Sequence, residues 1–240
     1  MDHPEPRHDR VPSDAPVVPL PPALWPARVV HEGRYARVEP LDIRLHAEEL
    51  YTASHSGEAA LRIWDYLSSG PYPNEVAFQT YLRDCSASAD PVFFALLDST
   101  TGRASGMASY LNIHPKAGTI EIGHIWFSPA LQRSPAVTEA LYLLLRHALD
   151  DLGYRRMEWK CNALNQASRR AAVRLGFSFE GIFYQHMIVK GRNRDTAWFS
   201  ILDSEWPPLR ANFEAWLSPA NFDEAGRQRT SLSERNLAGR

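Results

Sequence analysis

Hydrophobic and polar residues recur along this chain with two periods. Short apolar or alternating runs predict strands, and apolar residues spaced three and four apart predict helices. The predicted strands are 35–41, 92–98, 105–113, 119–127, 156–161, 177–189 and 196–202, and the predicted helices are 44–53, 74–84, 138–152 and 165–175. This order predicts an α/β fold, with a mixed, mostly antiparallel sheet and helices on both of its faces.

The helical period also predicts which side chains face the core. The predicted inward residues are Leu45, Leu50 and Tyr51; Val76, Phe78, Tyr81 and Leu82; Ala140, Leu141, Leu144, Leu145, Ala148 and Leu152; and Leu164, Ala167, Ala171, Ala172 and Leu175. Asn165 is a favourable N-cap for the last helix, and Gly176 can end it in a left-handed conformation. The run Gly191-Arg192-Asn193 predicts the turn of a terminal hairpin.

The two ends of the chain differ from its middle. Residues 1–26 are rich in proline, which opposes regular hydrogen bonding, so we expect an N-terminal arm whose apolar part, 17–25, lies against the domain. We expect one domain over 27–217 and a polar C-terminal tail over 218–240, frayed from residue 227 onward.

Composition excludes several classes of protein. The net charge of −2 creates no field that favours nucleic acid or an anionic membrane. Cys85 and Cys161 are far apart, which argues against a disulfide scaffold or a CxxC metal site and fits a reducing cytoplasm. No apolar run approaches the roughly 20 residues that span a bilayer, and the N-terminus does not resemble a signal peptide. We therefore expect a cytoplasmic protein, monomeric or homodimeric, with no metal, nucleic acid or membrane partner.

One short run carries a specific pattern. Asn165 and Ser168 are followed two helical turns later by Leu175, Gly176 and Phe177. An ordinary capped helix would have the same spacing. The string also resembles the coenzyme-A-facing helix of the GNAT N-acetyltransferase superfamily, and that resemblance implies a twisted sheet with a splayed central strand pair that admits acetyl-coenzyme A.

A second run, 125–137, lies between a predicted strand and the strongest predicted helix. It resembles the GNAT acetyl-coenzyme-A loop, although a plain strand-loop-helix connection is the alternative. Gln132 matches the pattern, whereas Pro135 and Val137 stand where the family usually has glycine and a small residue, and Arg133 replaces a frequent extra glycine. The resemblance implies that the coenzyme contacts Phe127, Ser128, Gln132, Arg133, Ser134, Ala136, Val137, Asn165 and Ser168. Helix N-terminal N–H groups are suited to the pyrophosphate, but Pro135 has none to offer.

Within the superfamily, the chain resembles the Rim-type ribosomal-protein N-terminal acetyltransferases. The matching residues are Glu121-Ile122-Gly123-His124-Ile125-Trp126, Thr138-Glu139-Ala140, Lys160-Cys161, Asn165-Gln166-Ala167-Ser168 and Glu180-Gly181. Many GNAT enzymes protonate the leaving thiolate with a tyrosine, but Ala172 occupies that position here. The resemblance implies Ser168 as that proton donor and Glu180 as the group that deprotonates the amine.

Other groups could handle the amine's proton. Glu158 is one, and Glu121 and His124 are two more, although strand parity puts these two on opposite faces. Cys161 is expected to be a buried thiol rather than a nucleophile.

The sequence thus predicts an N-acyltransferase that moves an acetyl group from acetyl-coenzyme A to a primary amine, at a protein N-terminus or on a small molecule. The alternative, favoured by Ala172 and Pro135, is a non-catalytic acyl-coenzyme-A-binding or protein-interaction module on the same fold. Aromatic residues are predicted to frame the mouth for the acceptor, although core packing would equally explain those of the 57–73 loop. They are Trp64, Tyr66 and Tyr72, with Tyr184 and His186 from the hairpin.

Overall fold

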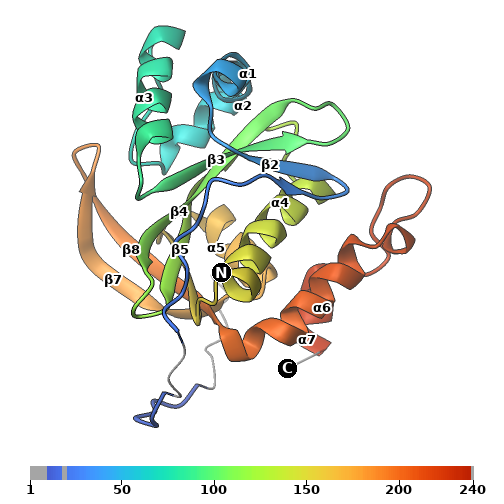
Figure 1. Ribbon diagram of the computed structural model, residues 1–240. Helices are drawn as coiled ribbons and strands as arrows, with labels where there is room; N and C mark the ends of the chain where they lie inside the picture. Colours follow the sequence, from blue (N-terminus) through green and yellow to red (C-terminus); the bar gives the residue numbers. More distant parts are fainter. Residues whose placement is uncertain (1–9, 18–20, 239–240) are drawn as a thin grey trace. The chain divides into compact units, whose positions relative to one another are not determined.

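The computed structural model describes residues 10–17 and 21–238 (Figure 1). The chain divides into two compact units. The β2–β5 unit comprises Pro26–Ile113 and Ile120–Ala148. The β6–β8 unit comprises the described residues up to Trp25, then His114–Thr119, and Leu149 onward.

The β2–β5 unit holds the first five strands and the first four helices of the chain. Its strands are β1 (His31–Glu32), β2 (Ala36–Pro40), β3 (Val92–Asp98), β4 (Ala104–His114) and β5 (Thr119–Phe127), in that order across the sheet. Its helices are α1 (Ile43–His55), α2 (Glu58–Leu61), α3 (Glu75–Ala87) and α4 (Pro135–Arg146), which continues as a π-helical turn over His147–Asp151. The pairs β1–β2, β2–β3 and β3–β4 are antiparallel.

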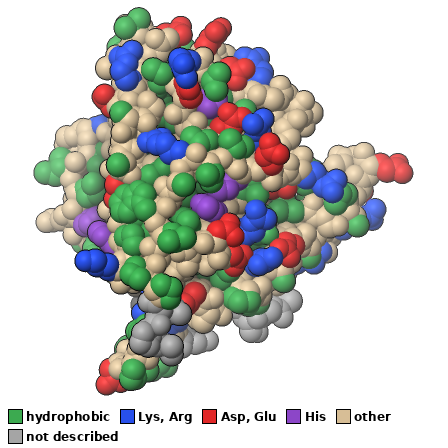
Figure 2. All heavy atoms as spheres, viewed as in Figure 1, with side chains coloured by type: hydrophobic (Ala, Val, Ile, Leu, Met, Phe, Trp, Pro, Cys, Tyr) green, Lys and Arg blue, Asp and Glu red, His purple; other side chains and the backbone are tan. Residues whose placement is uncertain are grey.

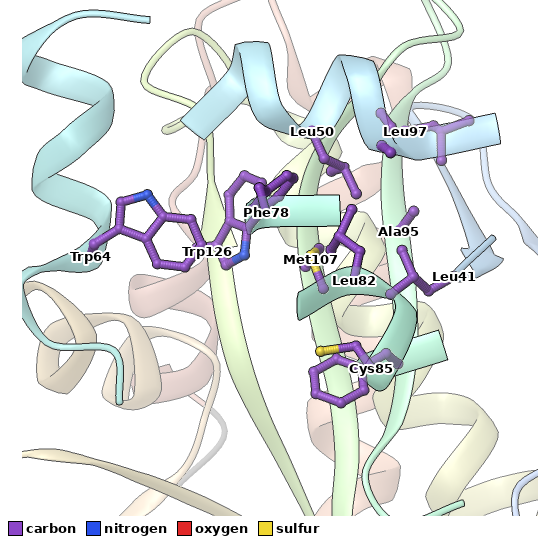
Figure 3. Close-up of a cluster of buried hydrophobic side chains, with 13 residues drawn as sticks. Leu41, Leu50, Trp64, Phe78, Leu82, Cys85, Ala95, Leu97, Met107 and Trp126 are labelled. Carbon is purple, nitrogen blue, oxygen red and sulfur yellow. The ribbon is translucent and has the colours of Figure 1, made fainter. Parts of the chain in front are cut away.

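Helices cover both faces of β3. Phe93, Ala95 and Leu97 belong to a core cluster with side chains of α1 and α3 (Figure 3). On the other face, the Phe94 ring contacts Tyr110 of β4, whose hydroxyl donates to the Leu144 carbonyl of α4 at 2.5 Å. This explains why six successive residues of β3, 92–97, are all buried.

The predicted inward faces of α1 and α3 need correction. Leu45 is 66% exposed and Val76 is 74% exposed, so both predictions are wrong. In α1 the inward stripe instead includes His46, because its ring accepts a hydrogen bond from the Asp42 N–H at 3.1 Å and contacts the Glu39 carboxylate at 3.1 Å. His46, a polar residue with hydrogen-bonding partners nearby, therefore occupies the core position that the hydrophobic pattern predicted for Leu45.

The β6–β8 unit holds the rest of the regular structure. Its strands are β6 (Arg156–Asn162), β7 (Ser178–Val189) and β8 (Arg192–Leu202), and its helices are α5 (Gln166–Arg174), α6 (Trp206–Leu217) and α7 (Leu232–Ala238). Strand β8 lies between β6 and β7 and is antiparallel to both. The hairpin turn lies at Lys190 and Gly191, which have φ of 49° and 72°. It is therefore one residue earlier than predicted.

The capped helix α5 is confirmed. The Asn165 side chain accepts a hydrogen bond from the Ser168 N–H at 3.0 Å, and Gly176 follows the helix with a φ of 95°. Two predicted inward residues are nevertheless exposed, Leu164 at 74% and Ala167, so the inward stripe is narrower than predicted. Leu164 lies in the turn before the cap, so the helical period does not yet apply to it.

The C-terminal region is more ordered than its composition suggests. Helix α7 occupies part of the segment that we expected to be frayed, so that expectation is wrong for 232–238. Leu232 is fully buried, and the Asn236 side chain donates to the Arg174 carbonyl of α5 at 3.0 Å. Leu232 is the buried apolar anchor of this helix and its other contacts are polar, so its apolar pattern is too weak to recognise in the sequence.

The N-terminal arm is anchored at its second half. The Ala23 N–H donates to the Pro115 carbonyl at 3.2 Å, and the Leu24 N–H donates to the Leu152 carbonyl at 2.9 Å. Residues 21–25 therefore lie against the β6–β8 unit as expected, while residues 18–20 are outside the described part of the chain. In the described residues, no helix is both long and apolar enough to cross a membrane.

We predict that Gly176→Ala destabilises the protein strongly. A Cβ at this position would lie 2.5 Å from the Leu209 side chain of α6, and the backbone would keep its left-handed conformation. Strain and overpacking together should lower the free energy of unfolding by about 2–4 kcal/mol, measured by urea denaturation. Gly153→Ala is the matched control, since Gly153 also has a positive φ but no atom near the position of its Cβ. An equal loss in both variants would show that contact with Leu209 contributes nothing.

Candidate active site

The loop between β5 and α4 is a tight, internally bonded turn. The Leu131 and Gln132 N–H groups donate to the Ser128 carbonyl at 3.0 and 3.1 Å, and the Gln132 side chain donates to the Phe127 carbonyl at 3.1 Å. Arg133 then adopts a φ of 64°. Arg133 thus has the left-handed conformation that glycine favours, which fits a position where the family often has glycine.

The N-terminus of α4 presents several donors for a ligand. Ser134 is the N-cap and Pro135 is the first helical residue. The missing N–H of proline matters little there, because first-turn N–H groups have no partner within the helix. The backbone N–H groups of Ala136 and Val137 remain suited to an anion. These residues therefore fit a pyrophosphate despite Pro135.

The Ser134 side chain adds an independent indication of a ligand. Its hydroxyl oxygen is buried but does not cap the helix, and among the described residues none offers it a hydrogen bond. Buried polar atoms without a partner are rare and need an explanation. A phosphate oxygen at the N-terminus of α4 would provide one.

The end of β5 orients the Phe127 N–H. The next residue, Ser128, donates its N–H to the Ser105 carbonyl at 2.8 Å, on the β4 side. Backbone donors alternate between the two edges of a strand, so the Phe127 N–H points to the edge opposite β4. The Phe127 N–H therefore has the direction that a main-chain donor needs to reach a ligand at the edge of β5 opposite β4.

Glu121 and His124 of β5 have different surroundings. Glu121 is buried and accepts a hydrogen bond from the Asn112 side chain at 2.6 Å. His124 is partly exposed, its φ is 50°, and its Nδ1 lies 2.8 Å from the Ser109 hydroxyl. The left-handed residue interrupts the alternation of the strand, so the parity argument does not hold at His124.

Ser168 lies in the first turn of α5, with its hydroxyl oriented by a neighbour. The Trp159 indole donates to Ser168 Oγ at 3.0 Å. An indole N–H can only donate, so the serine oxygen is the acceptor there and its own hydrogen is left for another partner. The sequence argument identified Ser168 but missed Trp159. The alternation of apolar and polar residues along β6, which predicts that Trp159 faces inward, could have pointed to it.

Glu180 belongs to a network of ions. Its carboxylate accepts hydrogen bonds from Arg156 at 2.8 and 2.6 Å, from Arg10 at 2.8 Å and from Ser200 at 2.7 Å. Partial burial alone would raise the pKa of Glu180, but the Arg156 and Ser200 hydrogen bonds and the two arginine charges lower it to about 2. Such a carboxylate is a weak base near neutral pH.

Ser168 and Glu180 lie on opposite faces of the β6–β8–β7 sheet. Helix α5 packs on the face of Trp159, Phe179 and Phe199, as the Trp159–Ser168 bond and the Arg169–Phe179 contact show. Glu180 follows Phe179 in β7, so strand alternation directs its side chain to the other face, where its partners Arg156 and Ser200 lie. The structure therefore does not bring the two predicted catalytic side chains together.

Glu158 shares the face of Glu180 and is also paired. Its carboxylate contacts Arg156 at 2.8 Å and Lys160 at 2.9 Å. Burial by itself would raise the pKa of Glu158, but these two cations hold it below its usual value. The Lys160 ammonium also lies 3.9 Å from the centre of the Trp198 ring.

The aromatic residues of the 57–73 loop are mostly packed in the core. Trp64 has no exposed surface, its indole donates to the Ser54 carbonyl at 3.1 Å, and its ring lies 5.9 Å from Trp126 (Figure 3). Trp64 therefore does not face an acceptor pocket, and that prediction is wrong. Tyr66 and Tyr184 are exposed, while the Tyr72 ring stacks on Tyr81.

Several remaining features bear on the chemistry. Ala172 of α5 is fully buried, and both cysteines are buried thiols, as predicted for Cys161. Within the described ranges, no three His, Cys, Asp or Glu side chains are grouped to hold a metal ion. On the face seen in Figure 2, Lys and Arg side chains are interspersed with Asp and Glu.

Comparison with known proteins places this architecture in a family. The model of the acetyltransferase (GNAT) domain matches residues 37–178. A GCN5-related N-acetyltransferase from Brucella melitensis, known from a crystal structure, is 49% identical, with a TM-score of 0.88 over 91% of this chain and 98% of that chain.

Two curated relatives are more distant. YdaF of Bacillus subtilis (strain 168), whose name suggests a ribosomal N-acetyltransferase, is 26% identical over 172 residues, which is 70% of this chain and 90% of its own length. The ribosomal-protein-serine acetyltransferase of Escherichia coli (strain K12) is 31% identical over 101 residues, which is 42% of this chain and 56% of its own length.

The chain therefore belongs to the GNAT acetyltransferase family. Its mixed α/β, mostly antiparallel fold is the fold of that family, as the sequence predicted. It is an enzyme of the transferase class, and the family uses acetyl-coenzyme A as co-substrate.

We predict that Glu180 stabilises the fold and that acid removes this effect. Because the folded-state pKa of about 2 is below the ordinary value of 4.5, the stabilisation is present above pH 4.5 and is lost as the pH falls toward 2. Glu180→Gln should cost about 1–2 kcal/mol of unfolding free energy at pH 7, after allowance for solvent screening.

The measurement is urea denaturation of both proteins between pH 7 and pH 2, with the difference between them shrinking toward zero. Glu58→Gln, at an exposed surface pair, is the control and should differ little from wild type at any pH. A constant difference across the range would contradict the assignment.

Proposed function

We propose that this enzyme transfers the acetyl group of acetyl-coenzyme A to a primary amine, with a protein N-terminus as the first candidate acceptor. The observation that carries the proposal is the N-terminus of α4, where Arg133 has a left-handed conformation and the buried Ser134 hydroxyl lacks a protein partner among the described residues. Membership of the GNAT family supports the donor, and the name of the Escherichia coli relative supports the acceptor.

The pyrophosphate of the coenzyme is held by the β5–α4 loop in this proposal. The main-chain N–H groups of Ala136 and Val137, the Ser134 hydroxyl and the Arg133 guanidinium are the donors, and Gln132 keeps the loop closed through its bond to the Phe127 carbonyl. The Phe127 N–H is the main-chain donor for the thioester oxygen. Preorganised donors of this kind are often the largest single contribution to acyl transfer.

As the amine nitrogen bonds to the acetyl carbon and the carbon–sulfur bond breaks, Ser168 passes a proton to the departing thiolate and regains one from water. Its oxygen already accepts the Trp159 N–H, which leaves its hydrogen for donation. Trp159 is then a positioning residue, and Asn165 supports the same turn by capping it. Ala172 offers no competing acid at the position where many family members carry a tyrosine.

His124 is a better candidate base than Glu180. Glu180 is bound by two arginines and its pKa is about 2, so we assign it a structural role. His124 is partly exposed and oriented by Ser109, and imidazole can accept a proton near neutral pH. A strained backbone conformation, as at His124, is typical of functional positions.

We predict that Ser134→Ala weakens coenzyme binding without harming the free protein. Removing a buried hydroxyl that has no protein partner should leave the melting temperature of the ligand-free protein unchanged or raise it, whereas loss of a hydrogen bond to phosphate should weaken binding by about 3- to 10-fold. Calorimetric titration with coenzyme A measures the affinity. Arg133→Gly is the companion variant, since it removes the guanidinium but suits the left-handed φ. If both variants bind as wild type does, the loop does not hold the pyrophosphate.

The proposed reaction is tested by incubating the enzyme and acetyl-coenzyme A with a panel of peptides and small amines, and locating the acetyl group by mass spectrometry. Peptides with free α-amino groups should gain a single acetyl group at the N-terminus. Ser168→Ala and His124→Gln should each lower kcat by about 10²- to 10⁴-fold with little change in coenzyme affinity, whereas Glu180→Gln should act mainly through stability.

Outcomes of the panel also separate the alternatives. Coenzyme binding without acetylation of any amine would favour a non-catalytic module. Full turnover in both Ser168→Ala and His124→Gln would show that these residues do not transfer protons and that positioning alone carries the reaction.

A further inference from the structure

Arg10, the first described residue of the N-terminal arm, forms an extensive set of hydrogen bonds. The Arg10 guanidinium donates to both Glu205 carboxylate oxygens at 2.7 and 2.6 Å, to Glu180 at 2.8 Å, and to the hydroxyl and carbonyl oxygens of Ser200 at 2.7 and 3.1 Å. A guanidinium has five N–H donors, and each of them finds an acceptor here. A surface arginine that merely follows the arm would not be saturated in this way.

The acceptors are held in place by groups other than Arg10. Arg156 binds both oxygens of Glu180, and the Ser200 hydroxyl donates to the same carboxylate. The Glu205 carboxylate accepts the Leu202 N–H at 2.9 Å and so caps the turn before α6. The three acceptor residues therefore form a built site and do not depend on the arm for their orientation.

The geometry and charge of this site favour a guanidinium. One edge of Arg10, Nε and Nη2, faces Glu205, and Nη1 and Nη2 reach Ser200. A lysine ammonium has one nitrogen and cannot span these acceptors. Without Arg10, the two glutamates outnumber Arg156 by one negative charge, so the site attracts a cation.

The arm reaches this site as a tethered loop. Residues 11–17 are exposed and form no helix or strand, and the next main-chain anchors of the described chain are Ala23 and Leu24. Arg10 thus fixes one end of the exposed segment 11–17. A tethered ligand of this kind is present at an effective concentration on the order of millimolar, so it fills a weak site and can also leave it.

We propose that Glu180, Ser200 and Glu205 form a guanidinium-binding socket whose resident ligand is Arg10, so that the described segment 10–17 is a strap that Arg10 fastens to the corner where β7, β8 and the start of α6 meet. The strap is distinct from acetyl transfer, since neither Ser168 nor the β5–α4 loop takes part in it. When the strap opens, the socket can take another guanidinium group.

The test uses the full chain and NMR. In wild type, the {1H}–15N heteronuclear NOE of Val11, Ser13 and Val17 should be that of an ordered segment. Arg10→Ala should reduce these values to those of a flexible chain, and Arg10→Lys should do the same although it keeps the charge. Arg62→Ala is the matched control and should leave the arm ordered. Arg62 is an exposed arginine at the C-terminal end of α2.

Chemical rescue then identifies the ligand class. Methylguanidinium added to Arg10→Ala should shift the Leu202 amide signal with saturation in the millimolar range, and methylammonium at equal ionic strength should give less than about a tenth of that shift. Wild type should respond to neither, because the arm fills the socket. Glu205→Gln keeps the shape of the socket and should free the arm, so it provides the test if Arg10→Ala folds poorly.

Two results would overturn the proposal. One is equal order of residues 11–17 in wild type, Arg10→Ala and Glu205→Gln. The other is an equal response of Leu202 to methylguanidinium and methylammonium, which would reduce the socket to a general site for cations. Failure of acetyl transfer in the amine panel would leave both measurements unaffected.

Discussion

The buried carboxylate of Glu139 fixes the helix on which the candidate site depends. It accepts the N–H groups of Tyr35 and of Ala36, the latter at 2.8 Å, and so attaches the second turn of α4 to the start of β2. Gly33 is required beside it, because a Cβ there would collide with the carboxylate. A buried charge is tolerated only when such bonds compensate its desolvation. With α4 held in this way, its N-terminus and the loop before it have a defined position within the β2–β5 unit.

Charged residues in the β6–β8 unit are organised for structure more than for proton transfer. Arg156 bridges Glu158 and Glu180, Lys160 adds to Glu158, and Arg10 adds to Glu180. Each cation lowers the pKa of its carboxylate, so a side chain that resembles a catalytic base becomes a poor one. In the proposed mechanism, the proton transfers are therefore assigned to other groups, the Ser168 hydroxyl and the His124 imidazole. An enzyme of this kind relies largely on preorganised donors and on the positioning of two substrates.

Local sequence rules predicted the structure correctly where the residues that determine a helix or strand lie within the same short segment. Asn165 and Gly176 delimit α5 because a side chain caps one end and a positive φ ends the other. Strands β3 and β5 have the predicted bounds because apolar runs and turn residues are local. Arg133 shows the limit of the rule. Its left-handed conformation is normal for glycine, and only the closed loop around it explains why arginine adopts it.

The sequence alone determined the family, the strands β2 to β8, the helices α1, α3, α4 and α5, and the cap of α5, because these depend on residues close together in the chain. It did not reveal β1, α2, α6 or α7, and it placed the start of α4 three residues too late. Tertiary structure decided the roles of individual side chains. In the folded protein Trp64 is buried, and Glu180 is paired with Arg156 and Arg10. Ser168 is oriented by Trp159, and α7 is held through Leu232 and Asn236. The physical reason is that burial, ion pairing and pKa depend on partners distant in sequence. Neither the hydrophobic periodicity nor a sequence motif indicates which of these distant residues will be in contact.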